Sequence, residues 1–258
     1  MLKLSIVMPA RNEEGCIADT VAQFVAALKQ AVIPFEIVVV DDGSTDGTAE
    51  IVRSLGRLHS EVRLVANTGR HGFGMAVRKG LENITGDAVS IVMADASDSP
   101  RDLVRYYRKL LEGFDCVFGS RFVAGGGTVD YPPHKLLINR LANWFIKVLF
   151  RLPYNDVTNA FKCYRREVVE GMAPLISPHF NLTVEMPLKA IIRGYSFAII
   201  PITWTNRQTG VSKLKLKEMG SRYLFIVLYL WLEKHLSRGD YRRAREATAQ
   251  QGARPTHA

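Results

Sequence analysis

The chain has 258 residues, of which 47% are hydrophobic and 23% are charged. This composition supports a packed core and excludes a disordered chain. The formal net charge of +9 favours anionic partners such as phosphate-bearing ligands, anionic lipid or nucleic acid. Nucleic acid is set aside because the sequence has no zinc-finger, recognition-helix or aromatic stacking pattern. Cys16, Cys116 and Cys163 form no Cys-x-x-Cys pair, which predicts buried thiols in a reducing compartment.

The first 120 residues alternate between two hydrophobic patterns. Short apolar runs predict strands at 3–8, 36–41, 62–66, 88–93 and 116–119, and helical periodicity marks 14–30, 46–57, 74–83 and 100–112. The first run is interpreted as a strand because it lacks a full signal-peptide core. The alternation predicts an α/β domain over 1–218, with a mostly parallel sheet covered by helices on both faces. In such sheets, ligands bind beyond the carboxyl ends of the strands.

The second half begins with a long loop rich in Gly and Pro, around 125–133. A basic helical pattern then covers 134–150. A strand and the start of a helix are expected within 156–169, a further helix at 181–193 and a strand at 195–204.

The segment 223–232, YLFIVLYLWL, is strongly apolar and has cationic residues on both sides. It is shorter than the roughly 20 residues that span a bilayer. Its aromatic content and flanking charges predict an amphipathic helix over 219–238 that lies at a membrane interface. A core helix or an oligomer contact is the alternative. Residues 239–258 are expected to form a flexible basic tail.

Polar residues follow the first two predicted strands. The first ends in Pro9-Ala10-Arg11-Asn12-Glu13, and the second in Asp41-Asp42-Gly43-Ser44-Thr45-Asp46-Gly47. Paired carboxylates at one strand end require hydrogen-bond donors or cations nearby, and they suit a nucleoside base or ribose. The alternative is a tight turn in which Ser44 or Asp46 caps the following helix.

The fourth predicted strand ends in Ala94-Asp95-Ala96-Ser97-Asp98-Ser99-Pro100. Asp95 and Asp98 offer the hard oxygen ligands that Mg²⁺ or Mn²⁺ prefers beside a diphosphate. Such a metal ion would act as a Lewis acid on the leaving group. Ser99 or Asp98 can instead cap a helix that begins at Pro100, and the two roles are compatible.

Taken in order, these motifs resemble a family 2 glycosyltransferase of GT-A fold. The resemblance rests on Pro-x-x-Asn-Glu, Val-Val-Asp-Asp-Gly-Ser-Thr-Asp, the Gly-x-Gly of Gly72-Phe73-Gly74, and the acidic cluster. Three later segments, starting at Gly119, Asp156 and Arg207, are similar to dolichol-phosphate mannose synthase and its bacterial polyprenyl-phosphate relatives. They read Gly-Ser-Arg-Phe, Asp-Val-Thr-Asn-Ala-Phe-Lys-Cys-Tyr-Arg and Arg-Gln-Thr-Gly-Val-Ser-Lys. The family's usual Asp-x-Asp is replaced here by Asp95-Ala96-Ser97-Asp98.

The resemblance implies a role for each matching residue. The nucleotide sugar, GDP-mannose or a UDP-sugar, is expected to contact Pro9, Arg11, Glu13, Asp41, Asp42, Gly74 and Asp95. Asp95 and Asp98 are expected to hold the metal, while Asp95, Arg121, Arg207 and Lys213 are the candidate catalytic residues. The phosphate of the acceptor is expected to meet Arg121, Lys135, Arg140 and Ser212.

The expected reaction transfers a sugar, with inversion, to a polyprenyl phosphate at the cytoplasmic face of a membrane. The protein is expected to associate peripherally or through a membrane-protein partner. A lipid phosphate is already nucleophilic and needs no strong base. If Glu185 is instead a base, the acceptor is a sugar hydroxyl of a cell-envelope glycan; its alternative role is a helix carboxylate paired with a nearby cation. A non-catalytic sugar-nucleotide binder is a third interpretation.

Overall fold

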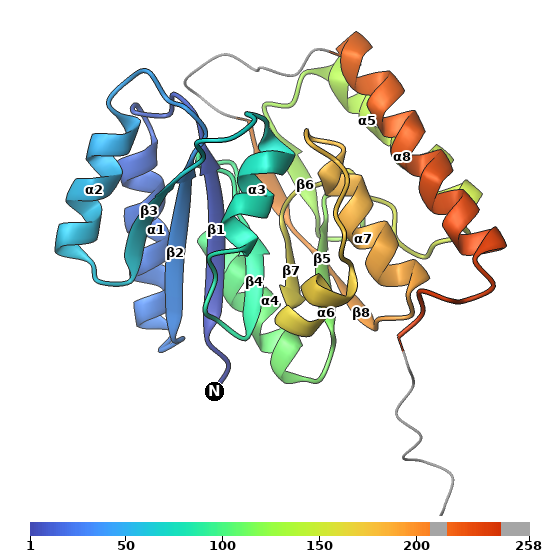
Figure 1. Ribbon diagram of the computed structural model, residues 1–258, viewed down its shortest axis with the longest axis horizontal. Helices are drawn as coiled ribbons and strands as arrows, with labels where there is room; N and C mark the ends of the chain where they lie inside the picture. Colours follow the sequence, from blue (N-terminus) through green and yellow to red (C-terminus); the bar gives the residue numbers. More distant parts are fainter. Residues whose placement is uncertain (207–215, 244–258) are drawn as a thin grey trace, which may run out of the picture.

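The computed structural model describes residues 1–206 and 216–243 of the chain. In these residues a sheet of seven strands has the order β3-β2-β1-β4-β7-β5-β8 (Figure 1). Its strands are β1 Leu4–Ala10, β2 Phe35–Asp41, β3 Val62–Ala66, β4 Ala88–Ile91, β5 Cys116–Ser120, β7 Lys162–Arg165 and β8 Phe197–Pro201. β7 runs antiparallel to β4 and β5, and the other pairings are parallel.

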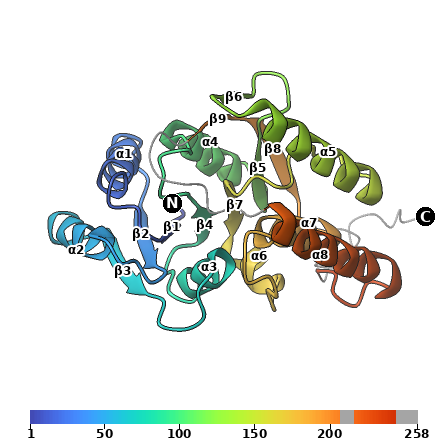
Figure 2. The ribbon, with the colours of Figure 1, turned by 90° about the horizontal axis from the view of Figure 1, so that it is seen from above.

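Helices cover both faces of the sheet, as predicted. The helices are α1 Ile17–Gln30, α2 Thr48–Leu58, α3 Phe73–Leu81, α4 Pro100–Leu111, α5 Pro133–Phe150, α6 Arg166–Gly171, α7 Leu182–Ile192 and α8 Leu216–Leu236. α1, α2 and α4 contribute to one hydrophobic core. α3, α5, α6, α7 and α8 contribute to the other, on the opposite face (Figure 2).

The central strands are buried on both faces. All seven residues of β1 are buried, and its alternation places Leu4 and Ile6 in one core and Val7 in the other. Strands covered on both sides read as nearly continuous apolar runs, which explains why the sequence predicted them well. The carboxyl ends of β1, β2, β4 and β5 therefore meet at one edge of the sheet, where the polar motifs begin.

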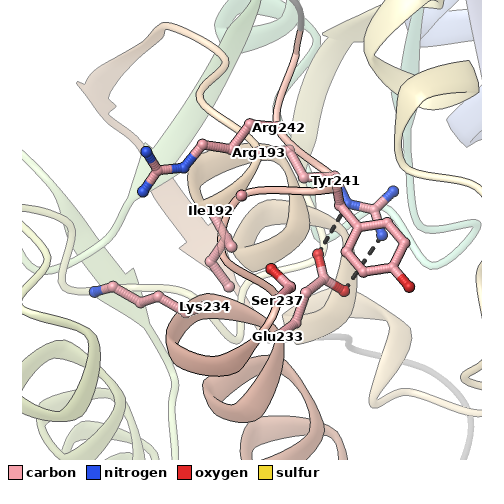
Figure 3. Close-up of a pocket in the computed structure, with 8 residues that line it drawn as sticks. Ile192, Arg193, Glu233, Lys234, Ser237, Tyr241 and Arg242 are labelled. Carbon is pink, nitrogen blue, oxygen red and sulfur yellow. Dashed lines mark hydrogen bonds and ion pairs between the residues drawn. The ribbon is translucent and has the colours of Figure 1, made fainter.

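α8 covers α7, the most buried helix of this half. Residues 182–190 of α7 are all buried, as expected for a helix enclosed by both the sheet and another helix. Figure 3 shows the polar contact that joins the two helix ends, where the guanidinium of Arg193 meets the carboxylate of Glu233 at 3.0 Å. Both side chains are only 4% exposed, so a buried ion pair joins the two helices.

The secondary structure differs from expectation at two places. The Gly-rich loop contains a short strand, β6 Gly127–Val129, and the strand expected at 195–204 is divided into β8 and β9 Thr203–Thr205. β6 and β9 form a separate parallel pair. In the described part of the expected tail, residues 239–243, the guanidinium of Arg243 lies 3.1 Å from the carboxylate of Asp115. Residues 244–258 lie outside the described residues.

The helix expected at 219–238 exists as α8 but is not amphipathic. Its inner side buries Ile226, Val227 and Leu230. Its outer side is also apolar, with Leu224, Phe225, Leu228, Tyr229, Leu232 and Leu236 between 37% and 69% exposed. No helix in the described part of the chain has the length and hydropathy to cross a membrane.

Candidate active site

A cavity of about 860 Å³ lies beyond the carboxyl ends of the central strands. Its volume is in the range of small-molecule sites. One end is polar, and contains most of the residues that the sequence singled out. The other end is apolar and runs between α5 and α8, where it is lined by Ile138, Ala142, Phe145, Ile146, Tyr223, Leu224 and Val227.

Pro9, Arg11, Glu13 and Asp42 all line the polar end, as expected for a nucleotide pocket. The buried carboxylate of Asp42 accepts hydrogen bonds from the Asn67 side chain at 2.6 Å and from the Gly72 amide at 2.8 Å. Its role within the chain is thus to fix the loop before α3. Asp41 does not line the cavity; it accepts a hydrogen bond from the Ser44 amide at 3.0 Å.

The Gly-x-Gly motif opens α3. Gly72 lines the cavity and has φ of +145°, a conformation that favours glycine. Gly74 is buried and does not line the cavity. A Cβ on Gly74 would come within 2.2 Å of the Ser177 carbonyl oxygen. The structure thus places Gly74 at a close backbone contact, which brings Phe73 against Phe180 with ring centroids 4.3 Å apart.

Asp95 and Asp98 both line the cavity and are 8% and 6% exposed. Burial raises the pKa of Asp98 to about 7, and the negative charge of Asp95 adds to this rise. The hydrogen bond that the carboxylate of Asp98 accepts from the Met93 amide opposes it. Two buried carboxylates of this kind fit a divalent cation, because a cation would relieve both desolvation and mutual repulsion. Among the described residues no group of three or more His, Cys, Asp or Glu side chains could hold a metal.

Arg121 follows β5 and lines the cavity, but its guanidinium has a partner in the protein. It donates to the fully buried Asp156 through Nε at 2.8 Å and Nη2 at 2.6 Å, and its backbone amide also donates to Asp156. The charge of Asp156 keeps the pKa of Arg121 above its ordinary value, against the effect of burial. The pair thus fixes a cation at the cavity wall with one edge of the guanidinium already bound.

The other residues expected to contact phosphate differ in whether they line the cavity. Lys135 of α5 lines the cavity. Arg140 of the same helix does not; it is exposed, and its guanidinium lies 5.3 Å from the Phe122 ring centroid. Arg207, Ser212 and Lys213 lie outside the described residues.

Glu185 is fully buried in α7 and is absent from the cavity lining. Its carboxylate pairs with the ammonium group of the equally buried Lys189 at 2.7 Å and accepts hydrogen bonds from the backbone amides of Ile176 and Ser177. Of the two roles considered for Glu185, the structure therefore shows a carboxylate paired with a cation of its own helix. Glu185 holds in place the segment that contacts Gly72 and Gly74.

Several cavity residues were not singled out from the sequence. They include Asn139 and Thr158, whose side chains are joined at 3.0 Å, and the aromatic pair of Tyr131 and Trp204. His71 and His179 also line the polar end. Asp156 and Thr158 fell within a segment quoted for its family resemblance, and this was the only signal that could have marked them.

The sequence profile described as Glycosyl transferase family 2 matches residues 5–172, well over half of the chain. The chain belongs to glycosyltransferase family 2. A relative named polyprenol monophosphomannose synthase, from Mycolicibacterium smegmatis, is 30% identical over 215 residues, covering 81% of this chain and 80% of the relative. The dolichol-phosphate mannosyltransferase of Pyrococcus furiosus is 30% identical over 220 residues; the match covers 83% of this chain but only 60% of that protein.

Solved structures share the fold. Glucosyl-3-phosphoglycerate synthase from Mycobacterium tuberculosis, including its complex with Mn²⁺, UDP and glucosyl-3-phosphoglycerate, superposes with a TM-score of 0.66 at 20% identity. The match covers 90% of this chain and 80% of that one. This family 2 glycosyltransferase therefore has the GT-A architecture that its motifs predicted.

Proposed function

We propose that this glycosyltransferase moves a sugar from a nucleotide sugar to a polyprenyl phosphate at a membrane surface. The observation that carries the proposal is the lining of the cavity, which joins polar residues that follow the strands to apolar residues of α5 and α8. A polyprenyl phosphate has the same division, with an anionic head and a hydrocarbon chain. The names of the two relatives support this acceptor class and favour mannose, from GDP-mannose, as the sugar.

The donor would occupy the polar end, with its nucleoside near Pro9, Arg11 and Asp42. Asp95 and Asp98 would hold Mg²⁺ or Mn²⁺, which supplies charge neutralisation for the departing nucleoside diphosphate. The protein's own task is positioning, because a phosphate monoester is already a competent nucleophile. Arg121 and Lys135, two of the cations that line the cavity, would orient the acceptor phosphate for displacement with inversion.

The same two helices would form the membrane contact. α5 and α8 lie side by side (Figures 1 and 2), and α5 exposes Leu137, Ile138, Leu141, Trp144, Phe145 and Val148 by 46% to 63%. Exposed apolar surface on this scale marks an interaction site. Cationic residues on or beside both helices suit anionic lipid headgroups: Lys135, Arg140, Lys147, Arg151, Arg222, Lys234 and Arg238. Peripheral binding would then bring the groove to the lipid.

The first test is a transfer assay. Protein, Mn²⁺ and a short polyprenyl phosphate are incubated with labelled nucleotide sugars, and label is counted in the organic phase. We expect transfer that is lost in Asp95→Ala and kept in Asp19→Ala, which changes an exposed carboxylate of α1. Nucleotide binding without transfer from any donor would reject the lipid-phosphate acceptor.

The second test is co-sedimentation with vesicles that contain anionic lipid. Leu224→Asp, on the outer side of α8, should weaken binding. Leu58→Asp changes an even more exposed leucine, 76% against 50%, on α2 and should not. Equal binding by the two variants would reject the α5–α8 surface as the membrane contact.

A further inference from the structure

The segment 155–159, whose residues Thr158 and Asn159 line the cavity, is held by three sets of contacts. Asp156 binds Arg121. The carbonyl oxygens of Val157 and Asn159 accept hydrogen bonds from the buried ammonium group of Lys162. The third contact, through Thr158, leads to α5.

Asn143 provides that third contact. It lies on the inner side of α5 and is 1% exposed, in a helix whose other buried residues are Ile146 and Phe150. Its Nδ2 donates to Thr158 Oγ1 at 2.8 Å, and its Oδ1 accepts the Thr158 amide at 3.1 Å. Both ends of one buried amide are thus bonded to Thr158.

Asn139, one helical turn before Asn143, links Thr158 and Asn143 to Arg121. Its Nδ2 donates to Thr158 Oγ1 at 3.0 Å, and its Oδ1 accepts hydrogen bonds from Asn143 Nδ2 at 3.0 Å and from Arg121 Nη2 at 3.4 Å. The inner face of α5 is therefore joined by amide contacts to the cation at the cavity wall. The outer face of the same helix is the exposed apolar surface described above.

We propose that Asn143 is a positioning residue that couples α5 to the acceptor end of the site by fixing Thr158 and, through Asn139 and the 155–159 segment, the direction of Arg121. This proposal rests on the proposed function, in which Arg121 orients the acceptor phosphate. Asn143 itself does not line the cavity. Loss of the Asn143 side chain should therefore lower transfer to the acceptor and leave nucleotide binding unchanged.

The test uses Asn143→Ala in detergent solution, with farnesyl phosphate as acceptor, so that vesicle binding plays no part. Transfer should fall about tenfold to a hundredfold, the scale on which small misplacements lower rates. The affinity for GDP with Mn²⁺, measured by calorimetry, should stay at the wild-type value. The matched control is Asn83→Ala, just after α3. Asn83 donates to the carbonyl oxygen four residues earlier, that of Lys79, as Asn143 does to that of Asn139.

Two further measurements separate positioning from folding. Thr158→Val removes the hydroxyl from the other side, and in a double-mutant cycle its effect on transfer should not add to that of Asn143→Ala. If Asn143→Ala does not fold, Thr158→Val alone should lower transfer and leave GDP affinity intact. Wild-type transfer in either variant, or a parallel loss of GDP affinity, would overturn the proposal. An inactive wild-type protein that still binds GDP would instead reject the proposed function.

Discussion

Glu185→Gln separates a structural carboxylate from a catalytic base. The substitution keeps the shape of the side chain but removes its charge. The ammonium group of the fully buried Lys189 would then keep its contacts with the Pro174 carbonyl oxygen and the Tyr229 ring but lose its counter-charge. Breaking a buried pair by neutralising one partner costs about 3–5 kcal/mol. That is a large share of the roughly 5–15 kcal/mol by which a domain is stable.

The assay is urea denaturation followed by circular dichroism, with transfer measured below the transition. We expect a much lower urea midpoint in Glu185→Gln and an unchanged transfer rate per folded molecule. Glu185→Gln combined with Lys189→Met should recover much of the loss, because no unpaired buried charge remains. A normal urea midpoint with transfer reduced about 10²- to 10⁴-fold, the contribution of a general base, would refute the structural role and restore the hydroxyl acceptor.

Further outcomes follow from single contacts. Gly74→Ala should destabilise the protein by about 1–3 kcal/mol through overpacking against the 177–179 segment, while Gly15→Ala, where a Cβ meets nothing within 4 Å, should be neutral in thermal melts. The pKa of Glu36 is lowered to about 2, because hydrogen bonds from Ser5, Thr85 and Arg63 outweigh burial. Its stabilising effect is complete above its ordinary pKa of 4.5 and is lost as the pH falls towards 2, so Glu36→Gln should flatten the acid limb of a stability–pH curve; an unchanged limb would contradict this assignment. Arg121→Lys should lower transfer, because an ammonium group cannot bind Asp156 through two nitrogens and also face the cavity; wild-type kinetics would exclude a role for the guanidinium.

The sequence predicted the sheet and the polar end of the cavity for one physical reason. Buried parallel strands read as apolar runs, and polar residues directly after them must lie at the same edge. Pro9, Asp42 and Asp95 accordingly all line the cavity. The same logic placed Asp41 in the pocket, although its side chain is used in the turn at Ser44.

The acceptor end could not be predicted in this way. Asp156 lies 35 residues after Arg121, and the segment that carries it precedes β7, the strand that runs against its neighbours. The contacts of Asn143 depend on the rotation of α5 about its axis, which an apolar pattern on both sides of the helix does not determine. Gly74 illustrates a related limit, because a motif glycine can serve a backbone contact rather than a ligand.

The charges around the cavity favour an acceptor that brings its own negative charge. The carboxylates that line it are Glu13, Asp42, Asp95 and Asp98. Asp42 is bound by backbone and side-chain donors, and Asp95 and Asp98 form the pair that suits a cation. The lining also contains the cations Arg121, Lys135 and Arg222, the phenols of Tyr131 and Tyr223, and the imidazoles of His71 and His179. A lipid phosphate needs cations for its head and an apolar path for its chain, and the lining of this cavity supplies both.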